Sequence, residues 1–251
     1  MSLEESTPAI VLRARDYAES DRIVTVLTRD AGKISGIAKG AKSSRRRFER
    51  KLEPFSHVML YFRRRPHGDL VFITRAESGG LPPHNVDSDL KKIALGSYML
   101  ELADALTREE AEAAQAYAII CGGLCAISER NATLALRQAF ELKLLAWSGY
   151  ALEFASCRVC ARKPGPETTS VSFVVSKGGI VCRNCRENSA TAAITISSAS
   201  AAAMVRLAAL DLEATVDDEP SGPDGASAIA RFLYSVLDRK LRSLEFLDST
   251  L

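Results

Sequence analysis

The first 76 residues contain five short segments with strand-like patterns, and no other feature constrains the fold as strongly. The stretch "AIVLRAR", residues 9–15, alternates with a period of two. Two further segments flank a tight turn at Gly32 within residues 22–40, and two more occupy residues 57–62 and 69–76. We expect these antiparallel segments to form a closed five-stranded barrel of the oligonucleotide/oligosaccharide-binding (OB) type, because closure removes exposed sheet edges.

A different pattern follows the stretch "SGGLPPHN", residues 78–85, whose glycines and prolines indicate a domain boundary. Apolar residues then recur with helical spacing, which predicts a bundle. Five helices are expected. The first begins after Asp89, the second covers Tyr117 to Leu124, and the third runs from Leu136 and stops at Gly149. The fourth starts at Ser197 or Ser198, and the fifth covers residues 229–241. The acidic stretch "DDEPSGPDG", residues 217–225, is expected to be a mobile loop.

Four of the six cysteines form two pairs, Cys157-x2-Cys160 and Cys182-x2-Cys185, with 21 residues between them. Two such pairs can hold one tetrahedral ion, and soft thiolates favour zinc. The intervening residues predict a hairpin that turns at Gly178-Gly179. A redox pair and disulfides are weaker alternatives, and four thiolates leave no open position for catalysis. We therefore expect one structural zinc ion bound by Cys157, Cys160, Cys182 and Cys185, with Cys121 and Cys125 as buried apolar residues of the bundle.

The resulting fold class is α+β with several domains. We expect an OB-type barrel in residues 1–80, a helical domain in residues 81–155 and 190–251, and a zinc-binding insert in residues 156–189.

Positive charge is concentrated in the barrel. Residues 1–80 carry 16 Lys and Arg against 10 Asp and Glu, whereas the remaining residues carry 17 against 21. The net formal charge of +2 is therefore the sum of a positively charged first part and a negatively charged second part. The stretch from Lys39 to Phe55 contains seven of the cations. A basic barrel with aromatic residues suits single-stranded nucleic acid, bound without sequence preference and with a strong dependence on salt. The residues expected to contact it are Arg13, Arg15, Lys33, Lys39, Lys42, Arg45, Arg46, Arg47, Phe48, Arg50, Lys51, Arg63, Arg64 and Arg65.

Phe48 is the preferred candidate for stacking on a base because it lies within the cationic run. Tyr61 is a further candidate, whereas Phe55 and Phe72 are expected in the barrel core.

Several function classes are disfavoured. The three histidines, His57, His67 and His84, have no spacing typical of a catalytic or metal site, and no phosphate-binding glycine loop occurs, so we infer no enzyme. There is neither a membrane span nor a secretory signal, which predicts a cytoplasmic protein.

The barrel sequence resembles the start of the RecO family of bacterial recombination mediators. The shared positions are Glu19, Asp21, Thr28, Gly32, Lys33, Lys39, Gly40, Lys42 and Leu52 to Phe55. The resemblance continues through the helical region, the double cysteine motif and the closing "LRSLEFL", in which Glu245 stands where family members often have a base.

This resemblance implies a nucleoid-associated protein that binds single- and double-stranded DNA and anneals complementary strands. It implies association with RecR and with the acidic, apolar-ended tail of single-stranded DNA-binding protein (SSB), and help in loading RecA. We expect Arg137 and Lys143 to contact the SSB tail. Two other readings stay open: an RNA-binding accessory factor, and a structural zinc scaffold whose basic loop is only a solvated surface.

Overall fold

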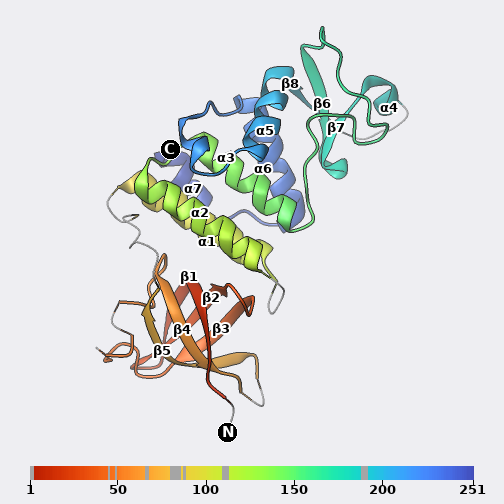
Figure 1. Ribbon diagram of the computed structural model, residues 1–251. Coiled ribbons are helices and arrows are strands. Elements are labelled where there is room, and N and C mark those ends of the chain that lie inside the picture. Colours follow the sequence, from red (N-terminus) through yellow and green to blue (C-terminus); the bar gives the residue numbers. More distant parts are fainter. Residues whose placement is uncertain are drawn as a thin grey trace. The chain divides into compact units, whose positions relative to one another are not determined.

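A computed structural model describes residues 3–44, 46–48, 50–65, 68–79, 86, 89–108, 113–187 and 192–251. The chain divides into two compact units, residues 1–129 and 130–251. Figure 1 shows the barrel in red to orange and the helices and small sheet of the second unit in green to blue.

The first unit contains the expected closed barrel. Its strands are β1 (Glu5–Tyr17), β2 (Asp21–Thr28), β3 (Lys33–Ala38), β4 (His57–Arg63) and β5 (Leu70–Ser78). Their order around the barrel is β1-β2-β3-β5-β4, and β1 closes it by pairing with β2 through residues 9–17 and with β4 through residues 5–10. The five-stranded barrel predicted from the alternating pattern is thus confirmed.

One pairing differs from the all-antiparallel expectation, because β3 and β5 run parallel. The chain leaves β3, crosses one end of the barrel and returns through β4, so that β5 reaches β3 in the same direction. Gly36 makes this pairing possible: a Cβ at this position would lie only 2.7 Å from Ile73 and 2.8 Å from Val71. The expected turn at Gly32 is present, with a positive φ of 71°.

Two helices complete the first unit. The Asp89 side chain caps α1 (Leu90–Leu106) by accepting a hydrogen bond from the Lys91 backbone N–H, as the sequence predicted. The second helix is α2 (Ala114–Glu129), and both helices pack against β1.

The described residues of the second unit form four helices of nine residues or more: α3 (Leu134–Trp147), α5 (Ser198–Ala209), α6 (Pro223–Leu237) and α7 (Arg242–Thr250). Helix α3 ends before Gly149, which has a φ of 87°, and Ser197 caps α5, as expected. Helix α6 starts earlier than predicted, with Pro223 in its first turn. The short helix α7 was not predicted. Within the described ranges, no helix has both the length and the apolar character needed to cross a membrane.

The acidic stretch 217–225 is not the mobile loop that its composition suggested. Asp224 accepts hydrogen bonds from the Ser197 backbone N–H at 2.5 Å and from the Ser200 hydroxyl at 2.6 Å. Burial opposes ionisation, but these hydrogen bonds outweigh it and lower the pKa of Asp224 to about 2. Nearby, Gln138 and Ser221 share two hydrogen bonds of 2.9 Å. These contacts fix the stretch to α3 and α5.

The cysteine-containing segment forms a small three-stranded sheet with order β7-β6-β8. Its elements are β6 (Ser170–Val174), the 3-10 turn η2 (Val175–Lys177), β7 (Gly179–Val181), the short helix α4 (Arg183–Glu187) and β8 (Ile194–Ser197). The predicted hairpin between the cysteine pairs is confirmed, with Gly178 at a φ of 62° in its turn. Figure 1 shows α4 beside this sheet.

Candidate nucleic-acid interface and metal centre

The cationic run between β3 and β4, here called the cationic segment (residues 39–55), is anchored in the barrel by two apolar side chains. Phe48 and Leu52 are each 2% exposed and belong to the barrel core. The carbonyl of Arg47 also accepts a hydrogen bond of 3.0 Å from the Ala76 backbone N–H on β5. Arg46 and Arg50, close to these anchors in the chain, are therefore exposed while the backbone next to them is held.

The same geometry changes the interpretation of Phe48. Its ring is buried against the barrel, so it does not present the free face that stacking on a base requires. The cations around Phe48 in the sequence suggested that its ring could stack on a base, but the ring is packed in the barrel core instead. One face of the Tyr61 ring is covered by the Arg75 guanidinium, which lies 3.8 Å from the ring centroid, so a base could stack on this face only if Arg75 moved.

Phe55 and Phe72 are half-buried rather than fully enclosed. Phe55 lies against α1, where a Cβ added to Gly96 would come within 2.9 Å of its ring. Phe55 is thus a packing residue of the first unit, and neither ring belongs to the buried barrel core in which both were expected.

The expected DNA-contacting cations fall into two groups. The first group is exposed or half-exposed and has no acidic partner among the residues that the structure describes. It consists of Arg15, Lys39, Arg46, Arg50, Lys51 and Arg65. Arg45 lies outside the described residues. Within the described part of the chain, the six side chains of this group have no internal ion pair that a phosphate would have to replace.

The second group already has partners within the chain. Lys33 is only 12% exposed and contacts Asp104, which also pairs with Arg13. Lys42 forms an ion pair of 3.0 Å with Asp16. Arg63 faces Glu4, just before β1, at 3.8 Å, and Arg64 faces Glu5, the first residue of β1, at 3.3 Å, while Arg47 donates to the Lys39 carbonyl. Contact with a phosphate would require most of these to exchange one partner for another.

The predicted cations line two separate grooves. One, of about 240 Å³, is bordered by Lys42 and Arg50 of the cationic segment. The other, of about 280 Å³, is bordered by Arg64 and Arg65 together with Lys33. Lys33 begins β3 and Lys39 follows its end, so the grooves lie at opposite ends of a strand roughly 20 Å long.

Sequence reasoning missed Arg22. Its guanidinium joins Glu53 at 2.5 Å and Asp16 at 3.3 Å, and the side chain lines the first groove. The Glu53 contact ties the end of the cationic segment to β2. Its position in a predicted strand gave no sign of this role.

The candidate partner-binding residues lie on α3. Arg137 is 15% exposed and forms ion pairs with Glu141 at 2.9 Å and with Asp248 of α7 at 3.0 Å. Lys143 is half-buried and donates a hydrogen bond of 3.1 Å to the Ala208 carbonyl. An acidic ligand at Arg137 would therefore compete with Asp248.

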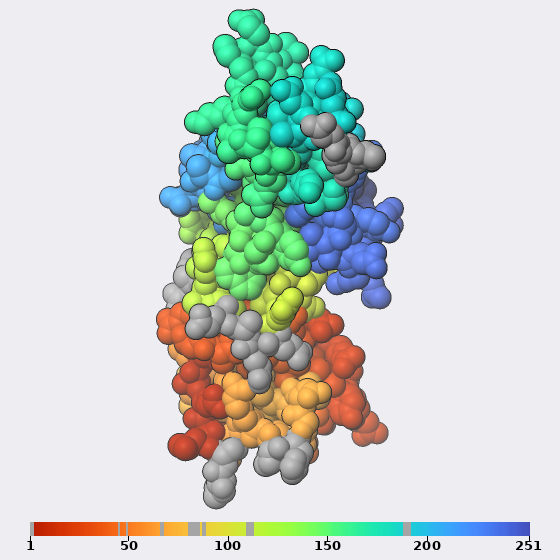
Figure 2. Space-filling model, turned by 90° about the vertical axis from the view of Figure 1, so that its right-hand side faces the viewer, coloured from red at the N-terminus to blue at the C-terminus, as the bar shows by residue number. Residues whose placement is uncertain are grey.

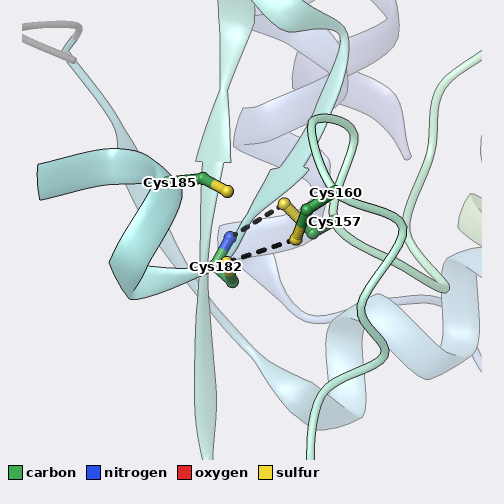
Figure 3. Close-up of side chains that lie close together, drawn as sticks. All are labelled: Cys157, Cys160, Cys182 and Cys185. Carbon is green, nitrogen blue, oxygen red and sulfur yellow. Dashed lines mark hydrogen bonds between the residues drawn. The ribbon is translucent and has the colours of Figure 1, made fainter. Parts of the chain in front are cut away.

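The two cysteine pairs meet at one point, as their spacing predicted. Figure 3 shows Cys157 and Cys160 on one loop and Cys182 and Cys185 at the end of β7 and on α4, with the sulfur atoms turned toward one another. All four sulfur atoms lie within 4.8 Å of one another. A tetrahedral zinc–thiolate site places its sulfur atoms roughly 3.8 Å apart. The 3.7 Å between Cys160 Sγ and Cys182 Sγ matches that distance.

Backbone groups support the cluster. Cys157 is 3% exposed, and its sulfur accepts a hydrogen bond of 3.3 Å from the Cys182 backbone N–H. Burial acts against its ionisation, but this and other N–H donors outweigh burial and lower the pKa of the Cys157 thiol to about 6. The loop turns at Ala161, which has a φ of 58°. The four cysteines could therefore hold a metal ion.

The remaining two cysteines behave differently. Cys121 and Cys125 on α2 are half-buried, and burial raises the pKa of the Cys121 thiol to about 11. A protonated, half-buried thiol fits a packing role, in line with the sequence interpretation.

Comparison with known proteins adds an independent finding. The family described as "Recombination protein O N terminal" matches residues 1–80, and "Recombination protein O C terminal" matches residues 87–246. A relative from Anaeromyxobacter sp. strain Fw109-5, "DNA repair protein RecO", is 38% identical over 95% of this chain and 93% of its own length. Proteins of the same name from Streptomyces griseus and Streptomyces avermitilis are 33% and 35% identical, each over 95% of this chain and 96% of their own.

Proposed function

Because the chain belongs to the RecO family of DNA repair proteins, we propose that it is a non-catalytic recombination mediator that binds single- and double-stranded DNA and anneals complementary strands. In this role it works in the cytoplasm at the nucleoid, associates with RecR and the SSB tail, and helps to load RecA. The observation that carries the proposal is the cationic segment, which is held to the barrel core by Phe48 and Leu52 and displays cations without internal acidic partners among the described residues.

The physical argument concerns repulsion between strands. Two single strands that approach each other carry one negative charge per nucleotide, and this repulsion slows their pairing. Lys39, Arg46 and Arg50 can replace the counterions of either strand without first losing an acidic partner described in the structure. Because these side chains contact phosphate rather than base edges, the effect should not depend on sequence.

The proposal is tested by annealing of complementary oligonucleotides that are coated with cognate SSB, measured with and without the protein over a series of salt concentrations. We expect acceleration that declines with salt and that is lost in the Arg46→Glu/Arg50→Glu variant. A Lys91→Glu/Arg231→Glu variant is the matched control, since it makes the same change in net charge at exposed helix positions. Equal annealing by the two variants would remove the cationic segment from the mechanism.

The same material distinguishes DNA from RNA as the ligand. A mediator should bind DNA oligonucleotides at least as tightly as RNA of the same sequence. Strong preference for RNA, without annealing of SSB-coated DNA, would favour the RNA-binding accessory factor instead.

For the cysteine cluster we propose one structural zinc ion. The support is the donor set: four thiolates at tetrahedral spacing fill the coordination sphere of zinc and leave no position for a substrate. When bound, the ion would crosslink the loop at Cys157 to β7 and α4, a segment with a core too small to hold its shape unaided.

For the SSB tail, the proposed contacts are Arg137 and Lys143. An acidic tail would replace Asp248 at Arg137, as two carboxylates compete for one guanidinium. Unchanged affinity for a tail peptide after both Arg137→Ala and Lys143→Ala would exclude this location.

A further inference from the structure

The cysteine-containing insert, residues 156–189, carries a positive charge that the net charge of the surrounding sequence hides. It contains six Lys and Arg against two acids. All other residues after position 80 carry 11 Lys and Arg against 19 Asp and Glu. The insert is therefore a segment of net positive charge within a part of the chain whose net charge is negative. Positive charge concentrated on so short a segment points to a polyanionic ligand.

Four of these cations border a single groove of about 690 Å³. Arg162 and Lys163 come from the loop that follows the first cysteine pair, while Arg183 and Arg186 come from α4 after Cys182. Figure 2 shows these two segments, in green and turquoise, side by side on one face of the second unit. The cations thus come from two directions onto one concave surface.

The charges on this surface are largely available. All four side chains are exposed. One acid, Glu187, borders the groove and pairs with Arg183 at 2.8 Å. Arg186 donates to the Ser172 hydroxyl at 2.7 Å, and neither Arg162 nor Lys163 has an acidic partner within the described ranges.

The rest of the lining indicates which part of a nucleic acid would fit. Thr168, Ser170 and Ser172, which carry hydroxyl groups, also line the groove. None of the described lining residues is aromatic, so the groove offers no platform on which bases could stack. Cations and hydroxyls are the groups that contact phosphate oxygens.

From this arrangement we propose that the insert groove is a second nucleic-acid site, which binds the phosphodiester backbone of DNA without reading its sequence. The inference rests on the proposed function and extends it: the barrel holds one strand or segment, and the insert holds another. A protein with two separate backbone sites gains from effective concentration, because binding at one site makes binding at the other intramolecular.

The cysteine cluster forms part of the wall of this groove. Cys157 and Cys182 themselves line it, and the Cys157 backbone N–H donates to the Arg162 carbonyl at 2.8 Å. Arg183 directly follows Cys182 in the chain. Loss of the crosslink would separate Arg162 and Lys163 from the cations of α4. Metal content should therefore affect the affinity of this groove for DNA.

The test uses the full chain and compares three double variants with the same change in net charge. They are Arg162→Glu/Lys163→Glu in the insert, Arg46→Glu/Arg50→Glu in the cationic segment, and Lys91→Glu/Arg231→Glu as control. Affinity for a labelled oligo-dT strand and for a labelled duplex is measured by fluorescence anisotropy over a salt series, with metal content and circular dichroism as checks on folding.

We expect the insert variant to bind the single strand roughly tenfold more weakly than the control, with the slope of log affinity against log salt reduced by about 1.4 for two lost contacts. An insert variant that matches the control, while the cationic-segment variant loses affinity, overturns the second site and leaves the proposed function intact. If neither variant differs from the control, the proposed function fails as well.

Two additional measurements keep the result unambiguous. Should the Glu pair reduce metal content, Arg162→Gln/Lys163→Gln replaces it, since Gln removes the charge without adding repulsion next to the thiolates. An acidic peptide that binds the wild type and not the insert variant, while DNA affinity stays unchanged, would assign the groove to a protein partner and overturn the proposal.

Discussion

The Asp21 carboxylate accepts a hydrogen bond of 2.8 Å from the backbone N–H of Gly40, and this contact joins the start of β2 to the point where the cationic segment begins. Gly40 has a φ of 65°, a conformation that disfavours a side chain. The two residues together set the direction in which Lys39 and the following cations leave the barrel.

This relationship predicts that Asp21→Ala weakens DNA binding although it removes a negative charge. Electrostatics alone would strengthen binding, whereas loss of the hydrogen bond releases the cationic segment and should lower affinity a few-fold. Asp21→Asn is the control, because its amide oxygen still accepts from Gly40 while the charge is equally lost. Anisotropy with oligo-dT decides between these effects, and tighter binding by the Ala variant would contradict the structural role.

The buried position of Phe48 predicts that its shape matters and its aromatic character does not. Phe48→Ala should lower the free energy of unfolding by roughly 3–5 kcal/mol, because it leaves a cavity in the barrel core. Phe48→Leu should retain most stability and bind oligo-dT nearly as well as the wild type. A large loss of affinity in the stable Leu variant, on the order of the 1–3 kcal/mol of a base stack, would show that the ring does contact DNA.

Metal binding by the cysteine cluster makes a prediction about stoichiometry. The protein purified from cells should contain one zinc per chain, measured by elemental analysis, and Cys182→Ser should lose it together with thermal stability. Cys121→Ala is the matched control, because its thiol lies on α2 and is not part of the cluster. Retention of a full equivalent of zinc in the Cys182 variant would show that the metal binds elsewhere.

A pH dependence of stability follows from His57. Its Nδ1 contacts the Gly79 carbonyl at 2.6 Å, and its Nε2 contacts the Tyr117 hydroxyl. Burial lowers the pKa of His57 in the folded protein, although the Gly79 contact partly opposes this. The unfolded chain therefore takes up a proton more readily once the pH falls below about 6.5.

This contribution to stability is fully present above that pH and is lost as the pH falls toward the lower folded pKa. Thermal unfolding of the wild type should shift to lower Tm over this range, and His57→Gln should show a smaller shift. If both proteins respond equally, the pH dependence comes from other groups.

Competition at Arg137 provides a test of the proposed SSB-tail site. Asp248→Asn should raise the affinity for an acidic tail peptide roughly two- to fivefold, because it removes a carboxylate whose surface ion pair is worth up to about 1 kcal/mol. Arg137→Ala should lower the affinity in the same assay. Opposite signs for these two variants would be hard to explain by a general change in charge.

The parts of the fold that could be predicted are those encoded by local patterns. Alternation identified all five barrel strands, and Asp89, Ser197 and Gly149 marked helix ends because capping involves only neighbouring residues. The parallel pairing of β3 and β5 was missed, since pairing depends on how distant segments meet. Asp224 was read as part of a mobile loop for the same reason, as its partners are 24 and 27 residues away.

The candidate sites show a similar division. The cysteine spacing predicted a cluster because four ligands of one kind leave few alternatives. Charge counting found the cationic segment but could not separate Lys42, which is paired with Asp16, from Arg46, which has no acidic partner among the described residues. Charge counting also combined the basic insert with its acidic surroundings. The insert groove could therefore be recognised only from the structure, which places Arg162 and Arg183 on one surface.

The closure of the barrel has a consequence for its synthesis on the ribosome. The pairing between β1 and β4 joins residues 5–10 to residues 57–62, so the second edge of β1 cannot be paired until about sixty residues have cleared the exit tunnel, and the barrel is complete only after β5 (Leu70–Ser78) has followed. Until β4 has emerged, β1 has β2 as its neighbour and its other edge is open, a state that invites association with other nascent chains. The cationic segment emerges during that interval, and its charge would keep neighbouring chains on a polysome apart.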